Sequence, residues 1–144
     1  MEFGKICLIH HWAGIGDIFY LQSVAKKYIS MGYQVIWPLR DDILWLGDYI
    51  KGITFCSRED NFPGKEYYGQ DSVIITPNFV YLGIMRPHLW GIGDDKIMSS
   101  KYSILNMDHT DWKSGFTFDR KFDKEDDLYY NVLGLKDDSE FVFI

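Results

Sequence analysis

Residues 5–18, which read KICLIHHWAGIGDI, join a short apolar run to a glycine-rich turn. The run from Lys5 to His10 is almost continuously apolar, as expected for a strand covered on both faces in a parallel sheet. After the turn, apolar residues recur every three or four positions, as on one face of a helix, at Ile18, Leu21, Val24, Ala25 and Tyr28. Gly32 then follows as a helix stop. The segment predicts a central strand, a glycine-bearing turn and a long helix.

Strands and helices continue to alternate along the rest of the chain. We expect further strands at 34–37, 53–56 and 72–76, with a helix capped by Asp41 or Asp42 between the first two. Later helices are expected at 96–107 and 123–133, and a last strand at 140–144. This order predicts an α/β fold with a Rossmann-like, doubly wound and mostly parallel sheet.

The composition limits the classes of partner. The chain has 144 residues, which is the size of a single domain. Its formal net charge of -6 repels phosphate backbones, and the basic pairs Lys26-Lys27 and Arg120-Lys121 are too short to form a basic patch. We therefore expect no nucleic-acid partner.

The apolar runs of the sequence indicate where in the cell the protein is expected. None approaches the ~20 residues of a membrane span, and no secretory leader follows Met1. We therefore expect no transmembrane segment and a soluble, cytoplasmic protein. Cys7 and Cys56 form no CxxC pair, so we expect buried free thiols rather than zinc ligands.

The glycine-rich turn fits two familiar phosphate-binding motifs poorly. A P-loop requires Gly-Lys-Ser/Thr, whereas Gly16 is followed by Asp17 and Ile18. A dinucleotide fingerprint requires a third glycine where this chain has Phe19, and the second predicted strand has no acid at its end. The turn instead places Asp17 at the carboxyl end of the first strand, where a carboxylate can take a proton from a substrate hydroxyl. The alternative is an ordinary first-turn aspartate that favours the helix dipole.

The opening of the chain resembles that of heptosyltransferase-like glycosyltransferases, which have the two-domain GT-B fold. The resemblance rests on segments 10–19, 21–28 and 32–38, and a weaker similarity continues through 101–102, 111–112, 116–120 and 125–133. It implies that residues 1–139 form the Rossmann-like, acceptor-side domain and that 140–144 begin a second domain. It also implies Asp17 as the general base, a nucleotide-sugar as donor substrate and a sugar acceptor.

Other candidate residues surround this expected base. Substrate or leaving-group contacts are expected from Gly14, Gly16, His10, His11, Asp111, Trp112 and Arg120. Each also has a structural alternative. The histidines can be strand-end residues, Trp112 and Asp111 can belong to the core, and Arg120 can pair with Asp119 or Asp123. No Asp-x-Asp motif is present, so we expect neither a metal nor a cofactor.

Two other functions remain open at this point. If the second domain is missing, the isolated chain is expected to be inactive, and it can act as a non-catalytic module that binds a glycan or docks onto another chain. The other alternative is a flavodoxin-like nucleotide-binding domain.

Overall fold

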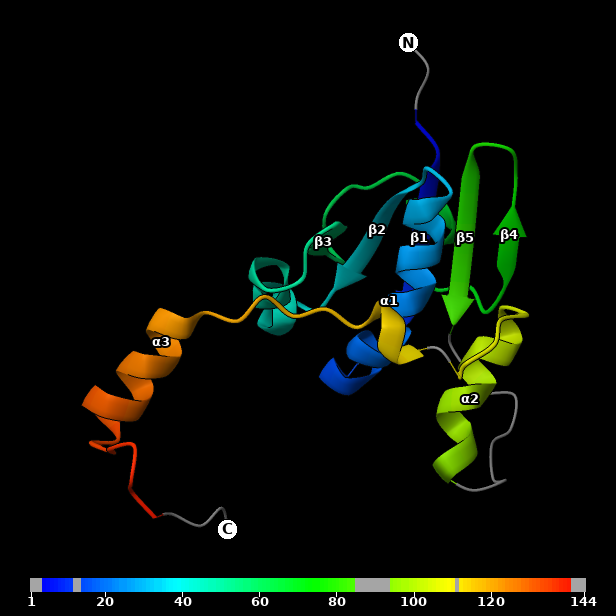
Figure 1. Ribbon diagram of the computed structural model, residues 1–144. Helices are drawn as coiled ribbons and strands as arrows, with labels where there is room; N and C mark the ends of the chain where they lie inside the picture. Colours follow the sequence, from blue (N-terminus) through cyan, green and yellow to red (C-terminus); the bar gives the residue numbers. More distant parts are fainter. Residues whose placement is uncertain (1–3, 12–13, 85–93, 111, 141–144) are drawn as a thin grey trace.

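The computed structural model describes residues 4–11, 14–84, 94–110 and 112–140 (Figure 1). The strands are β1 (Ile6–His11), β2 (Gln34–Leu39), β3 (Ile53–Ser57), β4 (Val73–Ile75) and β5 (Phe79–Ile84). The α-helices are α1 (Ile15–Ser30), α2 (Asp94–Ile104) and α3 (Phe122–Asp126). Shorter helical segments are η1 (Asp41–Asp48), η2 (Lys65–Tyr67), η3 (Trp112–Gly115) and η4 (Asp127–Val132).

The strands form one five-stranded sheet in the order β3-β2-β1-β5-β4. Neighbouring strands are parallel except for β4, which pairs antiparallel with β5. The chain builds β2 and β3 on one side of β1 and places β5 on the other. The strand order therefore reverses between β1 and β5, and in α/β sheets ligands bind beyond the carboxyl ends of the strands at such a point.

The α/β prediction is confirmed, and the structure adds a strand that the sequence reading missed. β5 is the direct neighbour of β1, so it is a central strand, and the expected strand at 72–76 is the short edge strand β4. The predicted helix after Asp41 is a 3-10 helix, η1. The helix expected at 123–133 is present as α3 continued by η4. Of the strand expected at 140–144, residues 141–144 lie outside the described residues.

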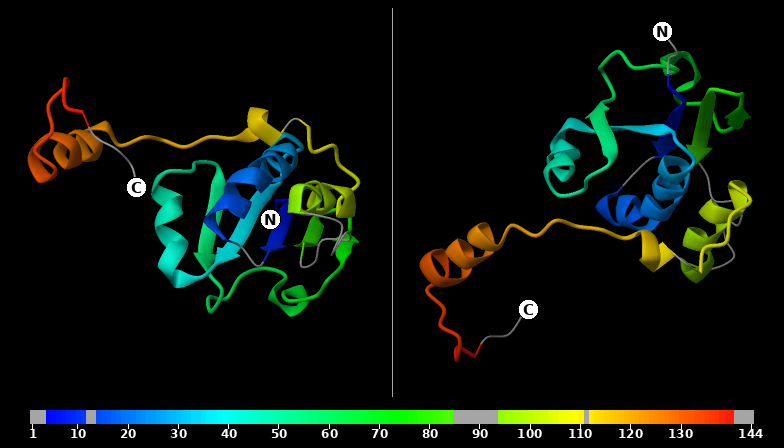
Figure 2. Two further views of the ribbon diagram at one scale, coloured as in Figure 1. Left: turned by 90° about the horizontal axis from the view of Figure 1, so that it is seen from below. Right: turned by 45° about the horizontal axis from the view of Figure 1, so that its top comes forward.

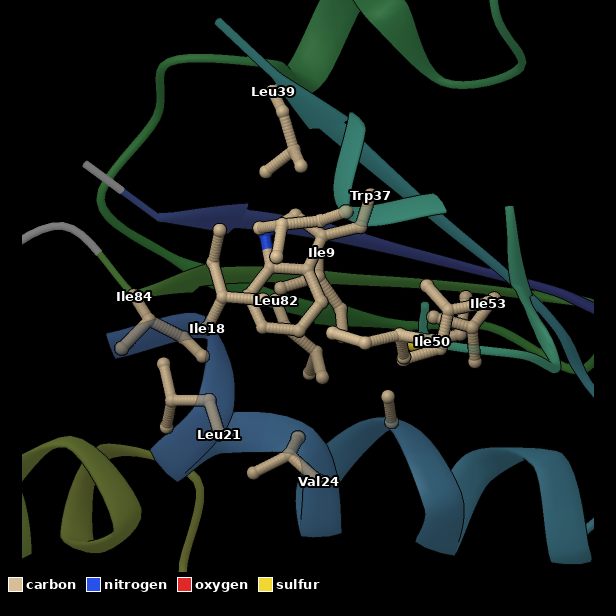
Figure 3. Packing of buried hydrophobic residues seen from close by; sticks show 14 of the residues in the cluster. Ile9, Ile18, Leu21, Val24, Trp37, Leu39, Ile50, Ile53, Leu82 and Ile84 are labelled. Atoms are coloured by element: carbon tan, nitrogen blue, oxygen red, sulfur yellow. The ribbon is translucent and has the colours of Figure 1, made fainter. Parts of the chain in front are cut away.

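The main core lies on the sheet face that α1 covers. Ile18, Leu21 and Val24 of α1 point toward Ile9 of β1 and Leu82 of β5 (Figure 3). All five side chains are buried. The long apolar stripe read from the sequence is therefore the stripe that packs on the sheet.

The opposite face is covered by the segment 58–72, which contains η2. Its core is a smaller cluster of Leu8, Ile36, Phe62 and Tyr81. The segment closes over β5 at Gly83, where a Cβ would lie only 2.2 Å from the Gln70 carbonyl oxygen. Glycine is needed there because the two backbones come so close together.

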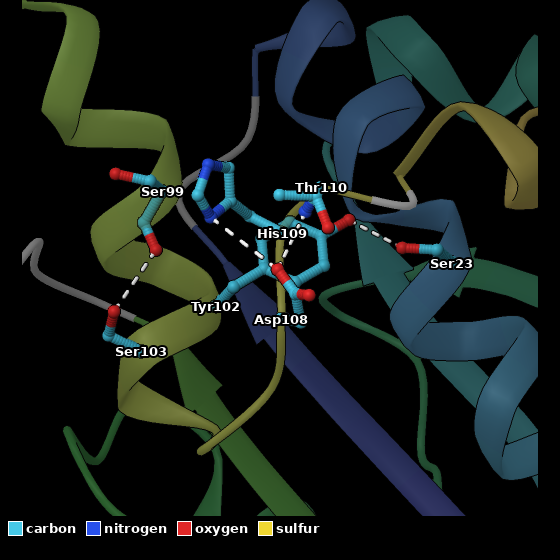
Figure 4. A network of polar contacts seen from close by, with 7 residues as sticks. All are labelled: Ser23, Ser99, Tyr102, Ser103, Asp108, His109 and Thr110. Carbon is cyan, nitrogen blue, oxygen red and sulfur yellow. Dashed lines mark hydrogen bonds and ion pairs between the residues drawn. The ribbon is translucent and has the colours of Figure 1, made fainter.

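Residues 112–119, which we call the strap, cross the outer side of α1. The buried Gln22 side chain donates to the Thr117 carbonyl oxygen at 3.0 Å and accepts from the Thr117 N–H at 2.9 Å. Gly115 lies so close that a Cβ there would be 2.4 Å from Ser23 Cα. The last turn of α2 also contacts α1, because the Tyr102 and Ser23 hydroxyls are 2.5 Å apart (Figure 4).

Beyond the strap the chain forms an arm, residues 122–140, that contains α3 and η4. Figures 1 and 2 show the arm standing away from the sheet at the end of an extended segment. The start of that extended segment is attached to the rest of the protein through Phe118, whose ring stacks on the Tyr49 ring at a centroid distance of 4.9 Å. No helix in the described part of the chain is long and apolar enough to cross a membrane.

Candidate functional site

Asp17 lies at the start of α1, beyond the carboxyl end of β1. Gly14 is the N-cap of this helix, and its backbone N–H donates to Asp17 Oδ2 at 3.2 Å. This contact is half of a capping box, in which the third helical residue reaches back to the N-cap. Asp17 thus caps its own helix, as the structural interpretation of this residue predicts. Any further role depends on the other groups that its carboxylate contacts.

The second contact of Asp17 is an ion pair with Lys101. The Lys101 ammonium comes from the last part of α2 and pairs with Asp17 Oδ1. The Lys101 side chain is 8% exposed and that of Asp17 is 24% exposed. Lys101 was not among the sequence candidates, because a lysine in a predicted helix has no local signal that it will be buried.

A pocket of about 540 Å³ with a mostly apolar lining opens beside Asp17. We call it the aromatic pocket, and its lining residues are Gly16, Asp17, Phe19, Tyr20, Trp112 and Phe116. The first four come from α1 and the last two from the strap. The Trp112 ring packs on the Tyr20 ring at a centroid distance of 4.9 Å. The strap therefore brings together Asp17 and Trp112, two candidates that are far apart in the sequence.

The glycines of the turn have different environments. Gly14 has the extended φ and ψ of an ordinary N-cap, and a Cβ added there would make only a 3.5 Å contact with Asp17. A Cβ at Gly16 would meet no atom within 4 Å. Neither glycine is therefore demanded by the backbone or by packing. Because Gly16 lines the aromatic pocket, its missing side chain leaves space there.

His11 lies on the same sheet face as Asp17 and is buried. Its Nδ1 atom has no hydrogen-bond partner among the described residues. The His11 pKa is lowered to about 4, chiefly by burial and then by the Lys101 cation, while the Asp17 carboxylate opposes this lowering. The imidazole is therefore neutral at pH 7, and it lies in the electrostatic field of the Asp17–Lys101 pair.

His10 points to the opposite face because successive strand residues alternate. Its ring stacks on Tyr68 at a centroid distance of 3.8 Å, and Nδ1 accepts the Gly69 N–H at 2.9 Å. Burial, followed by the nearby Arg58 charge, lowers the His10 pKa to about 4. His10 is thus a strand-end residue with a structural role, as the alternative interpretation predicts. The sheet separates it from the aromatic pocket.

The remaining candidates do not join the described site. Arg120 forms an ion pair with Glu125 and lies 4.7 Å from the Phe122 ring centroid, at the base of the arm. Its partner is thus neither Asp119 nor Asp123, the acids that the sequence suggested. Asp111 lies outside the described residues.

The comparisons with known proteins add no relative. The chain matches no protein-family model, no curated protein and no solved structure. Among the described residues, no three His, Cys, Asp or Glu side chains come together in a way that could hold a metal ion. The chemical groups of the described site are one carboxylate, its lysine partner and a set of aromatic rings.

Proposed function

We propose that this chain is the acceptor-side, Rossmann-like domain of a GT-B glycosyltransferase, with Asp17 as the general base. The observation that carries the proposal is that Asp17 is among the residues that line the aromatic pocket. Aromatic rings pack well against the apolar face of a sugar, while a carboxylate accepts hydrogen bonds from its hydroxyls. This combination suits a bound carbohydrate.

The chemistry that follows is an inverting sugar transfer. The acceptor hydroxyl attacks the anomeric carbon of a nucleotide-sugar, the bond to the diphosphate breaks, and Asp17 takes the hydroxyl proton. The topological position supports this role, because Asp17 stands where the strand order reverses between β1 and β5. The donor-binding half would come from a second domain or chain, and residues 14–17 would face it.

A flavodoxin-like nucleotide site is less well supported. At the start of α1, Asp17 already engages both the Gly14 N–H and the Lys101 ammonium, the two donors that a phosphate group at that helix end would use. A non-catalytic sugar-binding module would use the same aromatic pocket. Because both functions predict sugar binding, only a measurement of sugar transfer distinguishes the binding module from the enzyme.

The first test is sugar binding by the purified chain. We expect mono- and oligosaccharides to perturb the NMR signals of Trp112 and Gly16, and we expect Trp112→Ala to abolish binding. Gly16→Val should also weaken binding, because its side chain fills the pocket without backbone strain. Trp45→Ala is the matched control, since Trp45 is 45% exposed on η1 and does not line the pocket. Absence of sugar binding at millimolar concentration would contradict the proposal.

The second arm of the test separates binding from catalysis. Asp17→Asn keeps the shape of the side chain, so it should change sugar binding by no more than a few-fold. When the donor-binding half is supplied, the same substitution should lower transfer by about 100-fold or more, the usual cost of removing a general base. Unchanged transfer would exclude Asp17 as the base while leaving the sugar pocket in place.

A further inference from the structure

We propose that Lys101 is a positioning residue for Asp17, whose carboxylate it holds at the aromatic pocket in the orientation that accepts a proton from a bound hydroxyl. This inference rests on the proposed function, because it assigns Lys101 a role through Asp17. It goes further by naming a residue, from a distant helix, on which the base depends.

The geometry shows how the orientation is set. Lys101 binds Oδ1 of Asp17 and the Gly14 N–H binds Oδ2, so each carboxylate oxygen has one fixed donor. Two anchors on different oxygens restrict both side-chain torsions of Asp17. A carboxylate has about four lone-pair sites, so acceptor positions remain free for a substrate hydroxyl. Among the described residues, the Gly14 N–H would be the one remaining hydrogen-bond donor to this carboxylate without Lys101.

Docking of α2 does not by itself account for the buried ammonium. The neighbouring Tyr102 already attaches α2 to α1, because its ring is buried and its hydroxyl contacts Ser23 and donates to the Tyr20 carbonyl oxygen. An apolar side chain at position 101 would pack at this place without the desolvation cost of a charge. The pairing with Asp17 is what the ammonium adds.

His11 provides a readout of this pair that requires no activity. Apart from burial, the groups of the described residues that act on its titration are Lys101, Asp17, His10 and Arg58. The Lys101 cation lowers the pKa of His11 and the Asp17 carboxylate raises it. Lys101→Met should therefore raise the His11 pKa, and Asp17→Asn should lower it.

The test is a double-mutant cycle on the His11 pKa, measured by NMR. If Lys101 positions Asp17, the effect of Asp17→Asn should shrink to less than about half in the Lys101→Met background, because the carboxylate no longer stays near His11. Lys101→Arg should restore most of the effect. An Asp17→Asn shift of equal size in both backgrounds would overturn the proposal, because the two groups would then act independently.

A second readout does not need the Asp17 variant, which leaves the buried Lys101 ammonium without a charged partner and so lowers stability. The amide proton shift of Gly14 reports its hydrogen bond to Asp17 Oδ2. It should move in Lys101→Met and return in Lys101→Arg, with thermal unfolding recorded for both variants. An unmoved Gly14 amide in Lys101→Met would overturn the inference. Sugar binding is scored separately, so failure of the proposed function remains distinguishable from failure of this role.

Discussion

Helix α1 and the helical arm have similar sequence patterns and opposite surroundings. In α1, Leu21 and Val24 are 0% exposed, whereas in the arm Leu128 is 52% and Val132 is 67% exposed. Both segments have apolar residues at helical spacing and acids near the start. The difference is that α1 follows β1 directly and packs on the sheet, whereas the arm follows the strap and stands away from the sheet.

The arm is held together mainly by local contacts. Asn131 donates to Asp127 Oδ1 at 2.9 Å, and the Tyr129 hydroxyl donates to the Lys136 carbonyl oxygen at 2.8 Å. Such exposed contacts contribute little stability each. An apolar stripe therefore stabilises a helix only where another layer of the protein covers it.

The largest expected effect in this comparison comes from one substitution made in each helix. Leu21→Ala should lower the free energy of unfolding by about 3 kcal/mol, because it leaves a cavity between α1 and the sheet. The same change at Leu128 should cost less than about 0.5 kcal/mol, since its side chain is already largely in water. Denaturant unfolding of the two variants measures both values. Equal losses would show that the arm is packed as firmly as α1.

A second effect concerns pH and belongs to the sheet region alone, because residues 122–140 contain no histidine. The His11 pKa is lowered from 6.5 to about 4 on folding. The stability gained from neutral His11 is therefore present above about pH 6.5 and is lost as the pH falls toward 4, by at most about 3 kcal/mol.

The measurement for this effect is the slope of stability against pH. Between pH 6.5 and 4, His11→Gln should lose stability less steeply than the unmodified chain, as followed by denaturant unfolding. His10→Gln should flatten the curve in the same direction, because the His10 pKa is also lowered to about 4. Parallel curves for all three proteins would show that neither imidazole is buried in its neutral form.

The smallest expected effect is that of removing the arm. A chain ending at Lys121 should unfold with a free energy within about 0.5 kcal/mol of the full chain, because α3 and η4 cover little of the sheet. A chain ending at Thr110 is the control, since it also loses the strap and leaves the Gln22 amide without Thr117. That control should be clearly less stable. A large loss on removing the arm alone would mean that it contributes to the folded core.

The candidate site was only partly predictable. Asp17 followed from its place after a strand and two glycines, and Trp112 was a candidate because aromatic side chains pack on sugars. Nothing local indicated that Lys101 would be buried beside Asp17. The two histidines also read alike in the sequence, although alternation along β1 places His10 and His11 on opposite faces.

The α/β class, the opening strand, helix α1 and the acid in its first turn can all be predicted from the amino-acid sequence, because they depend on periodicity and turn residues within a short window. Three features became visible only in the folded chain: β5 pairs with β1, Lys101 pairs with Asp17, and the strap completes the aromatic pocket. These outcomes depend on contacts between residues distant along the chain. A continuous apolar run such as β5 lacks the alternation of apolar and polar residues by which a strand is recognised in a sequence. The partner of a buried charge depends on which distant segments pack together, and not on the neighbouring residues in the sequence.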